Sequence, residues 1–196
     1  CGQVLTWNGK VVEAYYFSTS AGVTSTDEIW GSDEAAPYLR SVPCKFDEEE
    51  PWSSWIVELP WKMLEDRIRE KGEGTVLRSV TVTRRSESGA ATALEAVSDK
   101  DSCIIENEYE IRKFLAPVNC MITEKDGTET AGGSLLPSAY FELERTQNGN
   151  LQVRGKGYGH GVGMSQTGAD KMAEQGYDYR EILDYFFRNI TVENLG

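Results

Sequence analysis

The first two apolar runs of the chain lie on either side of an Asn-Gly pair. Residues 3–8 (QVLTWN) and 11–17 (VVEAYYF) flank Asn8 and Gly9. Because both residues of this pair tolerate the positive φ angles of a type I′ turn, the pattern predicts a β-hairpin at the start of the chain.

Alternation of apolar and polar residues predicts two more hairpins further along. Residues 76–83 and 90–97 alternate on either side of the turn SESG, and residues 138–144 and 151–155 flank Gln147-Asn148-Gly149. A period of two residues is typical of strands with one buried face. Both pairs are therefore expected to form antiparallel hairpins.

Helical spacing of apolar residues indicates a few short helices between and after these hairpins. A helix is predicted over residues 59–68, with a proline in its first turn, and it is expected to stop at Gly72 and Gly74. Three further helices are predicted, over residues 108–114, over residues 169–173 with Gly176 as the C-terminal cap, and over residues 179–187.

These elements together predict an α+β fold of mostly antiparallel β-hairpins with short helices. We expect residues 1–50 and 151–196 to form the core of the domain and residues 51–150 to form an inserted α+β subdomain. The loop STSAGVTSTDEIWG (residues 18–31) is too long and polar for a tight turn, so it is predicted to be functional or mobile. The acidic run Glu48–Glu50 is interpreted as a solvated face.

Glycine occupies every second position from 155 to 163, in what we call the glycine ladder. Alternating glycines let the backbone approach a ligand or another strand closely. Tyr158, His160 and Val162 are expected to share one face of this segment. The ladder then leads into a predicted helix N-terminus, where free amides beside Ser165, Gln166 and Thr167 are suited to an oxygen-rich ligand.

His160 is the only histidine of the chain. A single histidine is often a structural hydrogen-bonding residue, but flanking glycines leave its ring uncovered and favour a functional role. Proton transfer, hydrogen bonding to sugar hydroxyls and metal ligation all stay open. Ser165 does not specify a Ser-His-Asp triad with His160, and no G-x-S-x-G elbow is present.

Composition narrows the classes of partner. With 32 acidic and 20 basic residues among 196, the net charge of −12 repels nucleic acid and anionic membrane surfaces, so nucleic acid is not expected as a partner. No apolar run is long enough to cross a bilayer.

The four cysteines contain no C-x-x-C pair, which excludes a zinc ribbon and leaves two disulfides or four thiols open. A chain that opens on Cys1 is expected to be a piece of a longer protein.

Two long stretches carry a family resemblance. Residues 157–187 (GYGHGVGMSQTGADKMAEQGYDYREILDYFF) resemble the signature of the stage II sporulation protein D family, which includes amidase-enhancer proteins. Residues 2–42, with their S-T-S-x-G-x-T loop and P-Y-L-R-S-V segment, are similar to the family's opening hairpin, and LPSAYFEL resembles its middle weakly. The sequence departs from the family pattern at Ala21, Tyr158 and Thr167.

The resemblance implies a peptidoglycan-binding lytic transglycosylase. Such an enzyme cleaves the bond between N-acetylmuramic acid and N-acetylglucosamine in denuded glycan and leaves a 1,6-anhydro product, in sporulation or cell-wall remodelling. Its acid is a glutamate in a helical segment expected upstream of this chain, so no catalytic residue is identified here. Five positions match the family's glycan cleft and are predicted to bind substrate: Thr24, Tyr38, Arg40, His160 and Gln166.

The resemblance leaves other possibilities open. The alternative function is a non-catalytic glycan-binding or amidase-activating module, with a cell-wall amidase as partner. No cofactor or metal is predicted, although some members hold zinc through Cys and His upstream of the hairpin and Cys1 lies near that edge. The family implies an extracytoplasmic location in the cell envelope, with the full-length protein anchored in the membrane.

Overall fold

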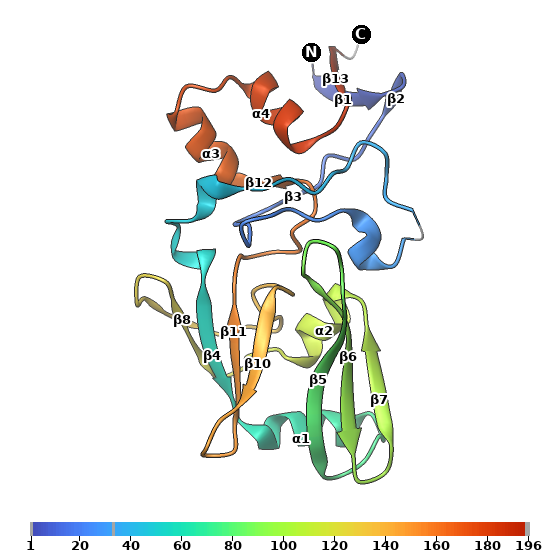
Figure 1. Cartoon of the computed structure of the whole chain (residues 1–196), viewed down its shortest axis with the longest axis vertical. Helices are drawn as coiled ribbons and strands as arrows, with labels where there is room; N and C mark the ends of the chain where they lie inside the picture. Colours follow the sequence, from blue (N-terminus) through green and yellow to red (C-terminus); the bar gives the residue numbers. More distant parts are fainter. Residues whose placement is uncertain (1, 33, 195–196) are drawn as a thin grey trace.

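A computed structural model describes residues 2–32 and 34–194. Helices and mostly antiparallel sheets make up the fold, which confirms the predicted α+β class. Figure 1 shows an upper part, where both termini meet near helices α3 and α4, and a lower part built from two sheets with α1 and α2. The glycine ladder leads from the lower part to the upper part.

The lower part contains a five-stranded sheet in the order β10-β11-β4-β8-β9, in which all neighbours are antiparallel. Its strands span Phe141–Arg145, Leu151–Gly155, Trp55–Leu59, Met121–Glu124 and Glu129–Ala131. The predicted hairpin across Gln147-Asn148-Gly149 is confirmed as β10–β11, with Leu143 opposite Val153. Strands β4, β8 and β9 were not predicted from the sequence.

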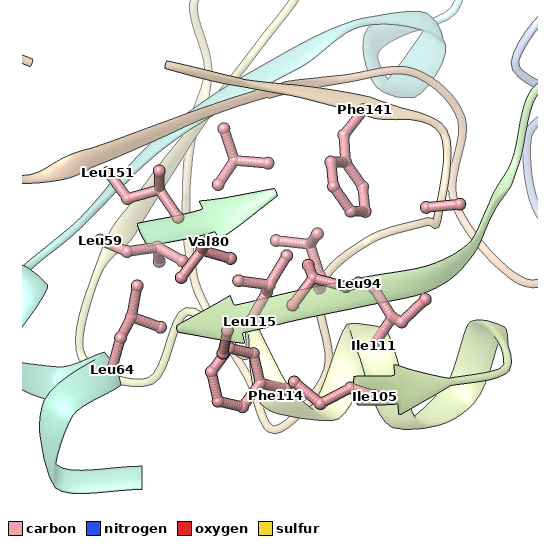
Figure 2. Packing of buried hydrophobic residues seen from close by; sticks show 14 of the residues in the cluster. Leu59, Leu64, Val80, Leu94, Ile105, Ile111, Phe114, Leu115, Phe141 and Leu151 are labelled. Atoms are coloured by element: carbon pink, nitrogen blue, oxygen red, sulfur yellow. The ribbon is translucent and has the colours of Figure 1, made fainter. Parts of the chain in front are cut away.

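A three-stranded antiparallel sheet, β5-β6-β7, completes the lower part. Its strands span Leu77–Arg85, Ala91–Ser98 and Ser102–Glu106. The hairpin predicted around SESG is therefore confirmed. Helices α1 (Trp61–Glu70) and α2 (Glu108–Phe114) confirm two predicted helices. Figure 2 shows how Leu64, Leu94 and Phe141 come together with other apolar side chains in the core between these elements.

The upper part has a second core, which includes Ile29, Val162, Met172 and Phe186. Helices α3 (Gln166–Glu174) and α4 (Tyr179–Phe186) confirm the last two predicted helices, and Gly176 has a φ of 94° just after α3. Strands β12 (Met164–Ser165) and β3 (Tyr16–Phe17) pair in parallel at the end of the ladder.

The opening hairpin is confirmed only near its turn. Strand β1 (Gln3–Trp7) pairs with β2 (Lys10–Val11), and Asn8 and Gly9 have φ angles of 50° and 71°. The predicted second strand is too long, because residues 16–17 leave β1 to pair with β12. The other edge of β1 is covered by β13 (Thr191–Asn194), which the sequence did not predict.

Short 3₁₀ turns connect these elements. They are η1 (Asp27–Trp30), η2 (Lys45–Asp47) and η3 (Pro51–Ser53). None of the helices in the part of the chain that the structure describes has the length and apolar character needed to span a bilayer. The division into a core and an inserted subdomain stays a prediction.

Candidate functional site

The glycine ladder lies directly against the hydroxyl-bearing loop (residues 18–25). Thr19 and Tyr158 exchange two backbone hydrogen bonds of 3.1 and 2.7 Å, and the Ser25 amide donates to the Gly161 carbonyl at 2.6 Å. A Cβ atom at Gly163 would lie 2.2 Å from the Tyr15 carbonyl oxygen, at a φ of 79°. Glycine is therefore needed for the close approach of backbones that the sequence predicted.

The ladder is not a regular strand, and its side chains do not share one face. Val162 is fully buried in the second core, whereas Tyr158 is 42% exposed and contacts Trp52. His160 is half-buried against other aromatic rings. Because four of the ladder glycines have positive φ, the strict alternation of a strand is lost between them, and this expectation was wrong.

His160 is held in place by its neighbours. Its ring packs edge-on to Trp30 at 5.2 Å and beside Phe17 at 5.8 Å, and its Nδ1 accepts a hydrogen bond of 3.1 Å from the Val162 amide. Burial, aided by the positive charge of Arg112 and opposed by a backbone hydrogen bond at Tyr16, lowers the pKa of His160 to about 4. The imidazole is therefore neutral at pH 7.

Trp30 lies at the centre of this aromatic group. It packs edge-on to Tyr15 at 5.0 Å as well as to His160. The Tyr15 hydroxyl donates to Glu13, and this hydrogen bond is the largest of the effects that raise the pKa of Tyr15 to about 12. The Trp30 indole is thus oriented from two sides while remaining half-buried.

A cavity of about 600 Å³ opens beside Trp30, and we call it the Trp30 cavity. Its wall comes from η1, from the end of the β5–β6 hairpin and from the start of α2, which approach one another in Figure 1. The residues that matter for its chemistry are Glu28, Trp30, Arg84, Arg85, Glu106 and Asn107. This volume is in the range of small-molecule sites.

The arginines of the Trp30 cavity are compensated within the protein, whereas Glu28 and Glu87 of its wall have no ion pair among the described residues. Arg84 pairs with Glu106 at 3.2 Å, and Arg85 pairs with Glu142 at 3.0 Å. Asn107, which caps α2 by accepting from the Glu110 amide, has an unusual φ of 62°. Backbone strain of this kind gathers at functional sites. A half-buried indole among paired arginines and hydroxyls is suited to a neutral, polar ligand such as a sugar.

Two of the five residues predicted to bind substrate make hydrogen bonds within the protein. Thr24 is fully buried, and its hydroxyl donates to the Arg40 carbonyl at 3.1 Å and accepts from the Val42 amide at 3.0 Å. The Arg40 guanidinium donates to the carbonyls of Asp184 and Tyr185 at the end of α4. These groups hold the loop and the terminal helix together.

The other predicted residues lie nearer the surface. Burial, followed by the charges of Glu13 and Asp27, raises the pKa of the half-buried Tyr38. Gln166 is exposed at the first position of α3. None of the five is among the described residues that line the Trp30 cavity. His160 packs against Trp30, which does line it. Their roles in substrate binding stay predictions.

The N-terminus of α3 is occupied by a side chain of the protein itself. The buried Asp47 carboxylate accepts hydrogen bonds from the Ser20 amide at 2.6 Å, from the Ser165 hydroxyl at 2.8 Å and from the Thr167 hydroxyl at 3.1 Å. Ser165 in turn accepts from the Gly168 amide at 3.2 Å. The Thr167 amide donates to the Ser18 carbonyl at 3.0 Å, so the expectation of free amides for a ligand here was wrong.

The described cysteines are thiols. Cys44, Cys103 and Cys120 are free, and burial raises the pKa of Cys44 to about 12, while Cys1 lies outside the described residues. Over residues 2–32 and 34–194 no group of three side chains is placed to hold a metal ion. His160 packs between aromatic rings and its Nδ1 accepts from the Val162 amide, so its position does not fit a zinc ligand.

The sequence did not single out the cavity wall. Trp30 lies in the polar segment of residues 18–31, and Asn107 precedes a predicted helix as a capping residue would, so each had a local signal. Arg84, Arg85 and Glu106 had none, because only the long-range pairing of β5, β6 and β7 brings them to Trp30.

Comparison with known proteins places this architecture in a family. A family model described as a domain of unknown function (DUF8618) matches residues 40–163, more than half of the chain. Stage II sporulation protein D of Bacillus amyloliquefaciens is 30% identical over 97% of this chain and 48% of its own length. The protein of the same name from Bacillus subtilis is 29% identical over 97% and 48%.

A more distant relative has another name. The amidase enhancer of Bacillus subtilis is 22% identical over 97% of this chain and 31% of its own length. The chain thus spans about half the length, or less, of these curated relatives. It belongs to the family described as DUF8618 and, with these relatives, to the stage II sporulation protein D family.

Proposed function

We propose that the chain has a cell-wall function and binds the glycan strands of peptidoglycan, with one sugar of the strand seated in the Trp30 cavity. The observation that carries this proposal is the half-buried Trp30 indole, fixed edge-on by Tyr15 and His160 beside a cavity of about 600 Å³. An aromatic ring face packs against the C–H groups of a pyranose, while surrounding polar groups bond to its hydroxyls. The names of the sporulation and amidase-enhancer relatives support a role at the cell wall.

We further propose that the chain contributes this binding to a lytic transglycosylase. In that reaction an acid protonates the glycosidic oxygen, the C1–O bond breaks, and the 6-hydroxyl of N-acetylmuramic acid closes onto C1 and loses its proton. The net result is cleavage without water and a 1,6-anhydro end. His160 does not suit the acid role at pH 7, because its pKa of about 4 leaves it deprotonated. Its part in the proposal is to position Trp30.

A second candidate is a binding module without catalysis, which could activate a cell-wall amidase. The relative named amidase enhancer supports an amidase as partner.

Incubation of the chain with purified sacculi, with and without peptide stems, tests both candidates. Pelleting measures binding, and mass spectrometry detects 1,6-anhydromuropeptides. Products together with binding would support the transglycosylase. Binding without products, both by this chain and by a longer protein that includes the expected upstream glutamate, would support the module. Failure of the chain to pellet with either kind of sacculus would overturn the proposed function as a whole.

Variants localise the binding. Trp30→Ala is expected to weaken pelleting roughly tenfold, because it removes the stacking surface, whereas Trp30→Phe should retain most of it. Trp7→Ala is the matched control, since Trp7 is also a half-buried tryptophan but lies in the terminal sheet. Equal losses in the Trp30 and Trp7 variants would show that the Trp30 cavity is not the site.

A further inference from the structure

A second cavity, of about 410 Å³, lies beside Tyr158 of the glycine ladder. Its wall includes Trp52, Arg112, Thr130, Ser134, Leu135 and Tyr158. We call it the Tyr158 cavity. Trp52 comes from η3, Arg112 from α2 and Tyr158 from the ladder, and residues 130–137 complete the wall, so distant segments of the chain build it.

Two aromatic rings form one side of this cavity. The Tyr158 and Trp52 rings pack edge to face, with centroids 4.6 Å apart and an interplanar angle of 62°. Tyr158 is nevertheless 42% exposed, so part of its ring is available to a ligand. The backbone holds the pair in place, because the Gly157 amide donates to the Trp52 carbonyl at 2.8 Å and Tyr158 is bonded to Thr19 in both directions.

The charge in the Tyr158 cavity is already balanced. The buried Arg112 forms an ion pair with the buried Glu108, and it donates to the carbonyls of Leu136 at 2.8 Å and Pro137 at 3.2 Å. A guanidinium that is neutralised by its own carboxylate offers little attraction to an anion. The exposed Ser134 beside it adds a hydroxyl. Aromatic rings, hydroxyls and compensated charge favour a neutral, polar ligand with apolar C–H faces.

The glycine ladder connects this cavity with the Trp30 cavity. Tyr158 lines one of them, and His160, two residues later, packs on the tryptophan that lines the other. Two residues of chain separate their Cα atoms by at most about 7 Å. Arg112 lines the Tyr158 cavity and also lies close enough to His160 for its charge to lower the histidine pKa.

We propose that the Tyr158 cavity is a second saccharide subsite, which takes a neutral N-acetylated amino sugar of the same glycan strand that occupies the Trp30 cavity. This proposal rests on the proposed function, since it extends the bound strand along the ladder. It predicts that affinity rises with glycan length and that Tyr158 is responsible for the increase.

The test titrates the whole chain with a disaccharide and a hexasaccharide of N-acetylglucosamine. Calorimetry gives the affinities, and the indole N–H signals of Trp30 and Trp52 in isotope-labelled NMR report on the two cavities separately. The disaccharide is expected to shift the Trp30 signal, and the hexasaccharide is expected to shift both. Trp61, whose indole donates to the Leu77 carbonyl at 3.1 Å, should stay unchanged in either titration.

Tyr158→Ala is expected to lower the affinity for the hexasaccharide by roughly 3–10-fold and to leave disaccharide binding unchanged. Tyr158→Phe should restore the hexasaccharide affinity, because it keeps the ring. Tyr109→Ala is the matched control, since Tyr109 is a tyrosine exposed to 50% on the surface of α2. The indole of Trp55, bonded to the Gly157 carbonyl at 2.9 Å, reports whether the ladder remains folded in each variant.

The outcomes separate this inference from the proposed function. Binding of both sugars with an unshifted Trp52 signal, or full hexasaccharide affinity in Tyr158→Ala, would overturn the second subsite and leave the Trp30 site standing. Absence of any sugar binding by the unmodified chain would overturn both. A Trp52 shift with peptide stems instead of saccharide would show that the cavity takes peptide, which also contradicts the proposal.

Discussion

His160 illustrates how the surroundings of a residue decide its chemistry. Its flanking glycines predict an uncovered ring, but those glycines allow the ladder to approach other segments closely. Phe17 of β3 and Trp30 of η1 then become neighbours of the ring. The ring is therefore desolvated, and desolvation favours its neutral form. A residue that looks like an acid or base in the sequence becomes a support for the Trp30 indole.

The lowered pKa of His160 predicts a pH dependence of stability. Its ordinary value is 6.5 and its folded value is about 4, so between these values the unfolded chain binds a proton that the folded chain does not. The contribution of His160 is therefore fully present above about pH 6.5 and is lost as pH falls toward 4, by at most about 1.4 kcal/mol per pH unit. NMR titration of the ring C–H protons measures the pKa directly, since the chain has one histidine.

His160→Gln serves as the control, because it keeps a polar side chain that does not titrate. Its free energy of unfolding is expected to fall less than that of the unmodified chain between pH 6.5 and 5. A histidine midpoint near 6.5 in the folded protein would contradict the burial of the ring.

Asp47 directly precedes the acidic run Glu48–Glu50, so its place in the sequence suggests solvent exposure. Its carboxylate instead satisfies the Ser20 amide and the hydroxyls of Ser165 and Thr167. Asp47→Ala is expected to lower the free energy of unfolding by roughly 1–3 kcal/mol, because it leaves the Ser20 amide buried without an acceptor. The Ser165 and Thr167 hydroxyls lose one acceptor and keep the Ser18 carbonyl. Chemical denaturation measures the loss.

Glu49→Ala is the control from this acidic run. The Glu49 side chain is 91% exposed and pairs with Lys125 only at the surface, so its loss should change stability by about 0.5 kcal/mol or less. Equal effects of the two substitutions would mean that the Asp47 network does not stabilise the fold. Composition could not distinguish these carboxylates, since burial of one depends on residues more than a hundred positions away.

At the scale of elements, the glycine ladder stabilises the fold because its missing side chains leave room for other backbone segments to pack closely. Gly163→Ala is expected to cost roughly 3 kcal/mol or more, because its Cβ would lie 2.2 Å from the Tyr15 carbonyl oxygen at a φ of 79°. Gly127→Ala has a similar φ of 87° with no atom within 4 Å, so it should cost only about 1 kcal/mol. Unfolding of both variants in denaturant separates steric contact from backbone strain, and similar losses would contradict the close approach.

The sequence could predict elements that are set by neighbouring residues. The helices α1 to α4 and the turns at Asn8-Gly9 and Asn148-Gly149 follow from spacing, caps and positive φ, and these predictions were confirmed. Pairings between distant segments were not predictable in this way. Strand β13 covers β1 across almost the whole chain, and β3 leaves its hairpin to pair with β12. Local patterns do not contain that information.

At the scale of the whole molecule, the candidate site depends on elements from both parts of the fold. Trp30 belongs to the second core, while Arg84 and Glu106 come from the sheet of the lower part. The ladder joins the two parts and carries both His160 and Tyr158 between the cavities. This arrangement explains why motifs at the two ends of the chain predicted the family well but did not predict the wall of the Trp30 cavity.

The charges of the protein predict how the affinity for a glycan depends on salt. The chain carries a charge of −12, and the arginines of the Trp30 cavity are paired with glutamates. We therefore expect the affinity for a neutral N-acetylglucosamine oligomer to change less than about twofold between low and high salt, because no net charge is screened on binding. Calorimetric titration in buffers of different ionic strength measures this, with the Trp30→Ala variant as the baseline. A marked fall in affinity with salt would show that the site recognises an anion, because only binding through unpaired cations would be screened in that way.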